Sequence, residues 1–168
     1  MLCSLNKRYL YYMKIRPYHA EDCPVLLELF RGTVYNVNSR DYSPEQVAAW
    51  VGCVDPARWA VTLAEHVTLV AEIDGVVVGF GDIVPETGYL DRLYVHCDYQ
   101  RRGIAAALCD RLEPLSRTGE VYSDVSVTAE PFFAARGYHV VRRQLVERCG
   151  VLLPNCKMLR KLTSGIER

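Results

Sequence analysis

The stretch "DYQRRGIAAAL", from Asp98 to Leu108, places two arginines and a glycine directly before a run of small and apolar residues. It follows GYLDRLYVHC (residues 88–97), which has the composition of a strand, and it leads into a helical pattern that Pro114 ends. A helix that begins after such a turn offers unbonded backbone N–H groups and the positive end of its dipole, so it can bind a phosphate or pyrophosphate. The alternative is a plain strand–helix connection with solvated arginines.

The residue types in this turn suit phosphate binding. Gly103 has no Cβ to block a close approach, Ala105 and Ala106 keep the first helical turn slim, and Arg101 and Arg102 add positive charge. The spacing matches neither GxxxxGK[ST] nor GxGxxG, which disfavours an NTPase or a dinucleotide-binding protein.

The rest of the chain predicts alternating strands and helices. Capped helix starts are expected at Ser43–Pro44 and Asp55–Pro56, and Asp74–Gly75 predicts a hairpin turn. Pro154, inside the last predicted strand, indicates an edge position or a bulge. The expected order is β-α-α-α-β-β-β-α-β-α-β-β, a mixed α/β (α+β) single domain, with strands at 14–18, 67–73, 76–84, 86–95, 120–127, 139–148 and 151–162 and helices at 20–35, 43–50, 55–66, 103–113 and 130–137.

The net charge limits the kinds of partner, and the N-terminal sequence indicates the compartment. The 168 residues carry no net charge, which argues against nucleic acid or an anionic membrane as the main partner. Residues 1–13 have neither the apolar run nor the cleavage site of a secretory signal, so we expect a cytoplasmic protein. We expect residues 1–12 to be a loose tail or an unused upstream start, 13–161 to form the domain, and 162–168 to be a C-terminal tail.

The cysteines indicate reduced thiols. Their number is odd and none forms a CxxC pair, so a disulfide framework and a zinc site are both disfavoured, and no metal is expected. The seven are Cys3, Cys23, Cys53, Cys97, Cys109, Cys149 and Cys156.

Three stretches in order resemble the GNAT N-acetyltransferase superfamily. "QRRGIA" (100–105) resembles its Q/R-x-x-G-x-G/A signature, "AEPFFAARGYHVV" (129–141) resembles its second signature, and the Asp74–Gly75 hairpin with "VVVGF" (76–80) is similar to the family's hairpin. The stretch "YSPEQVAAW" (42–50) resembles the bacterial YafP-like branch of this superfamily.

The resemblance implies a GNAT fold, with a mostly antiparallel sheet of six to seven strands, splayed at the cofactor site and flanked by about four to five helices. It implies acetyl-CoA as co-substrate and transfer of the acetyl group to a primary amine of a small molecule, by direct attack in a ternary complex. The cofactor-binding residues expected from it are Leu93, Tyr94, Val95, Gln100, Arg101, Arg102, Gly103, Ile104, Ala105, Ala106 and Phe133.

Candidate catalytic residues lie on and near the strand before the signature. Asp91 is the expected base, because strand alternation would place it on the same face as Leu93 and Val95, and Tyr89 could orient the substrate. Pairing with Arg92 is the alternative role for Asp91. Phe133 stands where family members often have a tyrosine acid, so Tyr138, Tyr122, a water or no dedicated acid would serve the leaving thiolate. Glu72 and Asp82 are weaker candidates, and His96, Cys97 and Cys109 are expected to be structural.

The sequence gives the least information about the identity of the acceptor amine. Trp50 and Trp59 are expected in the core, whereas Tyr35 and Tyr42 would suit an aromatic or compact cationic amine if they lined a cleft. A free amino acid, an arylamine, a polyamine and a protein N-terminus all fit. The alternatives to an enzyme are a non-catalytic CoA-binding or sensor module of the same fold and a structural domain with a coincidental signature. A homodimer through the terminal strands is also possible.

Overall fold

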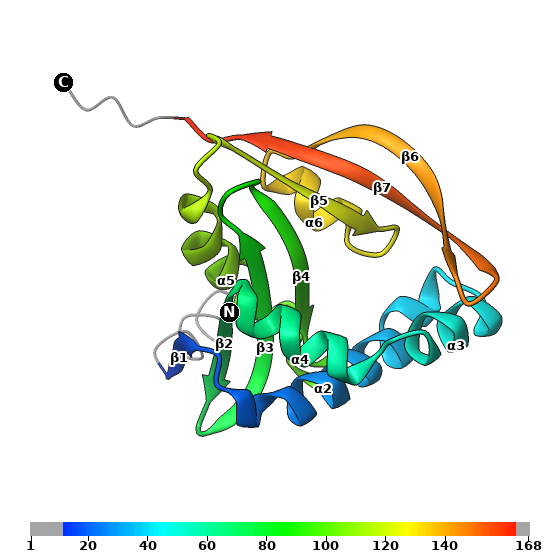
Figure 1. Ribbon diagram of the computed structural model, residues 1–168, viewed down its shortest axis with the longest axis horizontal. Helices are drawn as coiled ribbons and strands as arrows, with labels where there is room; N and C mark the ends of the chain where they lie inside the picture. Colours follow the sequence, from blue (N-terminus) through cyan, green and yellow to red (C-terminus); the bar gives the residue numbers. More distant parts are fainter. Residues whose placement is uncertain (1–11, 164–168) are drawn as a thin grey trace, which may run out of the picture.

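A computed structural model describes residues 12–163, and its centre is a seven-stranded sheet in the order β1-β2-β3-β4-β5-β7-β6 (Figure 1). Every neighbouring pair is antiparallel except β4 and β5, which are parallel. The strands are β1 (Met13–Pro17), β2 (Val67–Ile73), β3 (Val76–Val84), β4 (Tyr89–Val95), β5 (Glu120–Ser126), β6 (His139–Arg148) and β7 (Val151–Lys161). The helices are α2 (Cys23–Asn36), α3 (Pro44–Gly52), α4 (Pro56–Glu65), α5 (Ile104–Leu112) and α6 (Glu130–Ala135).

The predicted order of elements and the predicted fold class are confirmed. Ser43 accepts a hydrogen bond from Gln46 N–H, Asp55 accepts from Ala57 N–H, and Asp74 and Gly75 both have positive φ in the β2–β3 turn. These features depend on residues one to four positions apart, which is why the sequence is enough to predict them. The first strand begins at Met13 and the last strand ends at Lys161. Residues 1–11 and 164–168 of the predicted tails lie outside the described residues, so the predicted domain limits stay a prediction.

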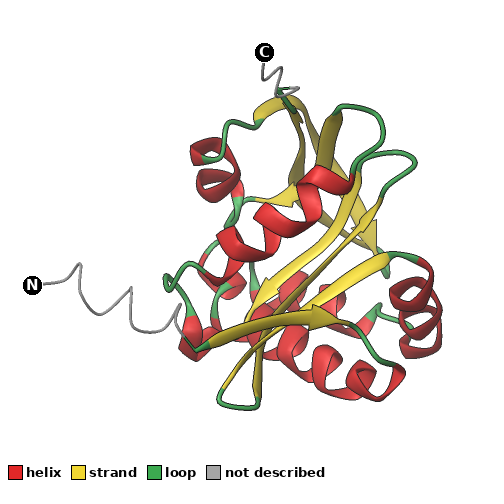
Figure 2. Ribbon diagram, turned by 90° about the vertical axis from the view of Figure 1, so that its left-hand side faces the viewer, coloured by secondary structure: helices red, strands yellow, loops and turns green. Residues whose placement is uncertain are grey.

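Helices cover both faces of the sheet (Figure 2). One apolar cluster joins the sheet to α5 and α6 and includes Ile104, Leu108 and Phe133. The other joins it to α2, α3 and α4 and includes Leu26, Phe30 and Leu63. None of the helices within residues 12–163 combines the length and the apolar character needed to cross a membrane.

Pro154 lies at a local edge, as one of the two predicted alternatives required, although β7 as a whole is an interior strand. β7 lies between β5 and β6, and its register shows no bulge at Pro154, which pairs with Leu145. The proline is tolerated because pairing with β5 ends at Asn155, so Pro154 lies just beyond that strand. Its C=O accepts a hydrogen bond from the Tyr42 hydroxyl instead (2.7 Å).

The expectation of reduced thiols is wrong for one pair. Cys53, after α3, forms a disulfide with Cys149, in the β6–β7 turn, across 96 residues of sequence. The bridge attaches the far end of the β6–β7 hairpin to α3, where Figure 1 shows the hairpin reaching the helices. The spacing of cysteines could not reveal it, because the two residues meet only through the fold.

Candidate active site

The sheet opens between β4 and β5. Their register contains the pair Tyr89–Tyr122, and Ser123 Oγ donates to Leu90 C=O nearby (2.7 Å). Within the described chain, no further pair joins the two strands toward Val95. His96 N–H donates to Val78 C=O, so alternation turns the backbone groups of Leu93 and Val95 away from β3 and toward the opening.

The turn before α5 has the backbone shape that was expected for an anion site. Gly103 is the N-cap of α5 with φ 80°, and Arg101 also has positive φ, 61°. The first intrahelical bond joins Ala107 N–H to Gly103 C=O, so the preceding N–H groups at Ile104, Ala105 and Ala106 have no intrahelical acceptor. This helix start follows β4 and lies at the open end of the β4–β5 gap.

Side chains of the turn fix the end of β4. Gln100 Nε2 donates to Val95 C=O (2.6 Å), and Thr33 Oγ1 of α2 donates to the same oxygen (2.9 Å). Arg102 donates to Asp98 C=O and lies over the Tyr99 ring, whereas Arg101 is exposed. The Val95 carbonyl therefore already has two donors, which leaves its N–H and the backbone of Leu93 for a ligand.

Two of the positions considered for a proton donor, Phe133 and Tyr138, lie on the α5–α6 face, whereas Tyr122 stacks on Tyr89. Phe133 is 3% exposed and packs edge-on against Tyr138, with ring centroids 5.0 Å apart. The Tyr138 hydroxyl donates to Glu113 at the C-terminal end of α5 (2.8 Å), and burial, followed by Glu113, raises the pKa of Tyr138 above its usual range. Tyr138 is thus held at the C-terminal end of α5, a helix of nine residues and about 13 Å, whereas Gly103 lies at its N-terminal end.

A β-bulge in β4 overturns the predicted orientation of Asp91. Asp82 pairs with Arg92 and Ile83 pairs with Leu90, so Asp91 has no partner in β3 and strand alternation is broken there. Leu93 packs with the α5 face, whereas the Asp91 carboxylate lies 3.1 Å from Arg92 Nη2 on the α4 side. The alternative interpretation, that Asp91 pairs with Arg92, is therefore observed.

Asp91 belongs to a charged cluster beneath α4. The fully buried Asp82 accepts from His66 Nδ1 (2.6 Å) and from Arg92 Nε (3.0 Å). Arg92 Nη2 also donates to Thr62 Oγ1 (2.9 Å), and its guanidinium lies 5.0 Å from the Trp59 ring centroid. Arg92 Nη1 is buried without a partner among the described residues, as expected where a water or ligand completes a site.

Tyr89 lies beside this cluster, at the closed end of the gap. Its ring stacks on Tyr122 (5.0 Å), and its hydroxyl donates to Asp124 (3.3 Å). Burial, followed by the charges of Asp91 and Asp124, raises the pKa of Tyr89 above its usual range. The hydroxyl therefore stays protonated. Its one hydrogen is donated to Asp124, so its oxygen can accept a hydrogen bond from a ligand.

The aromatic residues of the helices have separate roles. Trp59 packs on Phe30 and Phe80, and Trp50 on Tyr42, which confirms the expected core positions. Tyr42 is buried, and its hydroxyl joins Val127 N–H to Pro154 C=O, so it does not line a cleft. Tyr35 is 52% exposed.

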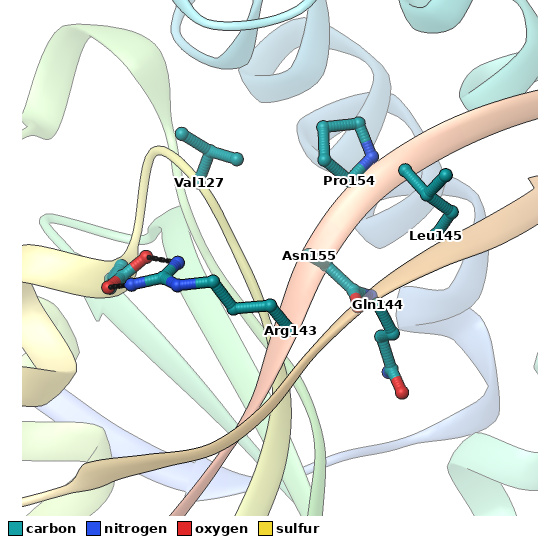
Figure 3. Close-up of a pocket in the computed structure, with 7 residues that line it drawn as sticks. Val127, Arg143, Gln144, Leu145, Pro154 and Asn155 are labelled. Carbon is teal, nitrogen blue, oxygen red and sulfur yellow. Dashed lines mark hydrogen bonds and ion pairs between the residues drawn. The ribbon is translucent and has the colours of Figure 1, made fainter.

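A separate pocket of about 460 Å³ lies where β7 continues past β5 (Figure 3). An ion pair between Arg143 and Glu130 forms one side, and Asn155 has a buried, unpartnered Oδ1. The pocket contains none of the predicted cofactor or catalytic residues. It is lined by Val127, Glu130, Arg143, Gln144, Leu145, Pro154 and Asn155.

Two groups of side chains bring possible metal ligands together: His96, Cys97 and Asp98, and His66, Asp82 and Asp91. In the second group Arg92 already bonds both carboxylates, and its charge opposes a cation there. Glu72, a weaker candidate base, instead accepts from Arg16 (2.8 Å) near β1.

Sequence reasoning missed His66, Thr33 and Thr62. His66 could have been found from the predicted hairpin. A two-residue turn at Asp74–Gly75 without any bulge pairs residue 67 with Asp82, and so places His66 near Asp82. Nothing in the local sequence indicated that Thr33 would bond Val95 or that Thr62 would bond Arg92.

The open parallel pair β4–β5 and the start of α5 beside it fit the expected class, the N-acetyltransferases, and comparison with known proteins agrees. A family model described as an acetyltransferase (GNAT) domain matches residues 38–159. The chain therefore belongs to the GNAT family, and it is an N-acetyltransferase.

Individual relatives support this assignment. The chain is 37% identical over 147 residues to the uncharacterised N-acetyltransferase YafP of Escherichia coli K12, covering 87% of this chain and 94% of that protein. A crystal structure of a GCN5-related N-acetyltransferase from Rhodopseudomonas palustris is 36% identical, with a TM-score of 0.83, covering 89% of this chain and 95% of that one. The PaiA N-acetyltransferase of Thermoplasma acidophilum, solved with coenzyme A, shares the fold at 20% identity and a TM-score of 0.70, covering 89% and 98%.

Proposed function

We propose that the protein transfers the acetyl group of acetyl-CoA to a primary amine of a small molecule, by direct attack in a ternary complex. The observation that carries this proposal is the gap between β4 and β5, which ends at the N-terminus of α5. The gap offers strand edges to an extended amide-containing chain, and the helix start offers N–H donors to a diphosphate. Coenzyme A contains both groups, and the PaiA protein of the same fold was solved with it.

The proposed cofactor contacts are mostly made by the backbone. The N–H groups from Arg101 to Ala106 hold the diphosphate, and the edge groups of Leu93 and the N–H of Val95 bond the pantetheine arm. Gln100 acts indirectly, because its side chain already holds Val95 C=O. Tyr94 contributes its strand backbone, because its ring packs against Phe30 and Phe80. Phe133 supports the gap from the buried core.

The chemistry requires a neutral amine, a stabilised carbonyl oxygen and a tolerable leaving group. Asp91 binds the incoming ammonium, and Tyr89 orients it from the neighbouring strand position. A β4 backbone N–H stabilises the oxygen of the thioester as charge develops there. A thiolate whose conjugate acid has a pKa of about 8.5 can leave without a dedicated acid, which fits Phe133 in place of a tyrosine. Holding both substrates in the gap supplies orientation.

A non-catalytic CoA-binding module is the second candidate, and Phe133 is the specific observation that favours it. A thermal shift and retention on CoA-agarose test for cofactor binding, and release of free thiol across a panel of amines tests for catalysis. The panel contains amino acids, arylamines, polyamines and peptide N-termini. We expect amine-dependent thiol release; binding without any release would favour the module, and no binding would reject both.

The role of Asp91 is tested with Asp91→Asn against the exposed Asp110→Asn as control. On an acceptor found in the panel, Asp91→Asn should raise the KM for the amine about tenfold or more, because a charge-assisted contact is lost. Unchanged kinetics would remove Asp91 from the site.

A further inference from the structure

We propose that His66 is the general base that takes the proton from the acceptor ammonium, and that Asp82 is the positioning residue that orients it. This assignment rests on the proposed acetyl transfer. His66 is the residue between α4 and β2, and its Nδ1 lies 2.6 Å from Asp82 Oδ2 and 3.8 Å from Asp91 Oδ2.

The surroundings of Asp82 fix which imidazole nitrogen carries hydrogen. Asp82 is fully buried, and Arg92 donates to it through both Nε and Nη2, so its carboxyl oxygens act as acceptors in this cluster. We assign a hydrogen to His66 Nδ1, because the oxygen 2.6 Å away is an acceptor. In the neutral ring, the basic lone pair is then on Nε2.

That nitrogen is available to a ligand. The His66 side chain is 16% exposed. Its Nε2 has no hydrogen-bond partner within residues 12–163, and it is not among the buried atoms that lack one, so solvent reaches it. A histidine with one nitrogen bonded to a buried carboxylate and the other free is the arrangement that general-base catalysis requires.

The cluster also lies where the thioester is expected. The Asp91 bulge is four residues before Val95, so it lies about 13 Å along β4 from the α5 end of the gap. A pantetheine arm that follows the β4 edge from the diphosphate would bring its thioester toward this bulge. His66 lies next to the bulge, with its Nδ1 3.8 Å from Asp91 Oδ2.

The charges favour an ammonium group there. His66 contacts Asp82 from β3 and lies 3.8 Å from Asp91 of β4. Arg92 of β4 bonds both of these carboxylates and also donates to the neutral Thr62 of α4. With a neutral imidazole, two carboxylates and one guanidinium leave a net charge of −1. Asp91, 30% exposed and held by Arg92, can bind the ammonium while His66 accepts its proton.

Acetyl transfer moves two protons from the acceptor nitrogen, one to His66 and one to the CoA sulfur. His66 Nε2 takes one proton from R–NH3⁺, and the free amine forms a C–N bond to the thioester carbonyl carbon. Cleavage of the C–S bond releases the CoA thiolate, which takes the second proton from the nitrogen and leaves as the thiol. The amide is then neutral, and His66 returns its proton to solvent.

Two variants remove the base while each keeps one polar contact. His66→Asn keeps a donor toward Asp82, and His66→Gln places an amide near Nε2. For both we expect kcat to fall about 100-fold or more, the size of a general-base contribution, with the Kd for acetyl-CoA unchanged. The pH profile of kcat/KM should also differ between the wild-type protein and both variants, because a side chain that accepts a proton has been removed.

His139→Asn is the matched control, because His139 is exposed on β6. It should keep wild-type kcat and pH profile, and circular dichroism should show all three variants folded. If both His66 variants kept kcat within about threefold of wild type with an unchanged pH profile, His66 would not be the base although acetyl transfer stands. If the wild-type protein released no thiol with any amine, the proposed function would fail, and this assignment with it.

Discussion

Gly103 is the residue on which the cofactor proposal depends most directly. Its φ of 80° suits glycine, and the absence of a Cβ leaves the N–H groups of α5 open. Gly103→Val should weaken CoA binding about 100-fold, equivalent to roughly 2.7 kcal/mol, as measured by isothermal titration calorimetry.

Gly75→Val is the matched control for this prediction. Gly75 has φ 77° in the β2–β3 turn, and nothing lies within 4 Å of where its Cβ would be. Valine at this position suffers the same backbone strain as valine at position 103, but it lies away from the gap. The Gly75→Val variant should therefore lose stability and keep its affinity for CoA. Equal losses of affinity in the two variants would contradict a diphosphate site at Gly103.

Asp22 provides a pH-dependent contribution to stability. Hydrogen bonds from Arg16, at 2.7 and 2.8 Å, lower the pKa of Asp22, and the N–H of His19 lowers it further. Because the unfolded chain binds a proton more readily there, this contribution is present above the ordinary aspartate pKa of about 3.9 and is lost as the pH falls through the lower folded value.

Asp22→Asn should therefore cost about 2 kcal/mol in the free energy of unfolding at pH 7, and the difference from wild type should shrink below about pH 4. Urea denaturation at several pH values measures both quantities. Glu28→Gln, which removes an exposed partner of Arg31, should change stability by less than about 0.5 kcal/mol. A cost for Asp22→Asn that stayed constant from pH 7 to pH 3 would contradict the pairing.

At the scale of elements, Tyr42 connects β5 and β7 just beyond their last paired residues. Its buried hydroxyl accepts from Val127 N–H (2.9 Å) and donates to Pro154 C=O (2.7 Å), and so replaces the missing ladder bonds. Tyr42→Phe should lower the free energy of unfolding by about 1–3 kcal/mol, because two backbone groups lose their partner.

The exposed Tyr35, on α2, gives the control for this change. Tyr35→Phe removes a hydroxyl that is not buried in the core, so the expected change is close to zero. Thermal or urea unfolding of the two variants makes the comparison, and equal stabilities would show that the Tyr42 hydroxyl does not join the strands.

The bulge in β4 is the element-scale feature that the sequence did not reveal. Strand alternation predicts Asp91 beside Leu93 and Val95, but one unpaired residue moves it toward α4 and Arg92. The period of a strand is two residues, so one extra residue reverses the face of every side chain beyond it. The same bulge is what brings Asp91 into the cluster with His66.

At the scale of the whole molecule, the Cys53–Cys149 disulfide closes a long loop between α3 and the β6–β7 turn. Replacing both cysteines with serine should lower the free energy of unfolding by about 4 kcal/mol, mainly through the entropy of the unfolded chain. Denaturant unfolding without reductant measures this change.

The bridge itself is tested by alkylating unfolded protein before and after reduction. Mass spectrometry should show two additional modified cysteines after reduction. An equal number of modified cysteines in both samples would show that Cys53 and Cys149 are free thiols and that the predicted stability loss has no basis.

The sequence alone determined the features that depend on near neighbours. The order of elements, the capped helix starts, the Asp74–Gly75 turn and the glycine at the start of α5 each follow from residues a few positions apart. The resemblance carried by three short stretches then led to the family.

Only the tertiary structure decided the surroundings of the candidate site. His66 meets Asp82 16 positions away, Thr33 bonds the Val95 carbonyl 62 positions away, and Cys53 pairs with Cys149 96 positions away. The contact of Asp82 with Arg92 depends on the register of β3 and β4. Such contacts form because hydrophobic packing fixes how strands and helices lie against one another, and local preference carries no information about that placement.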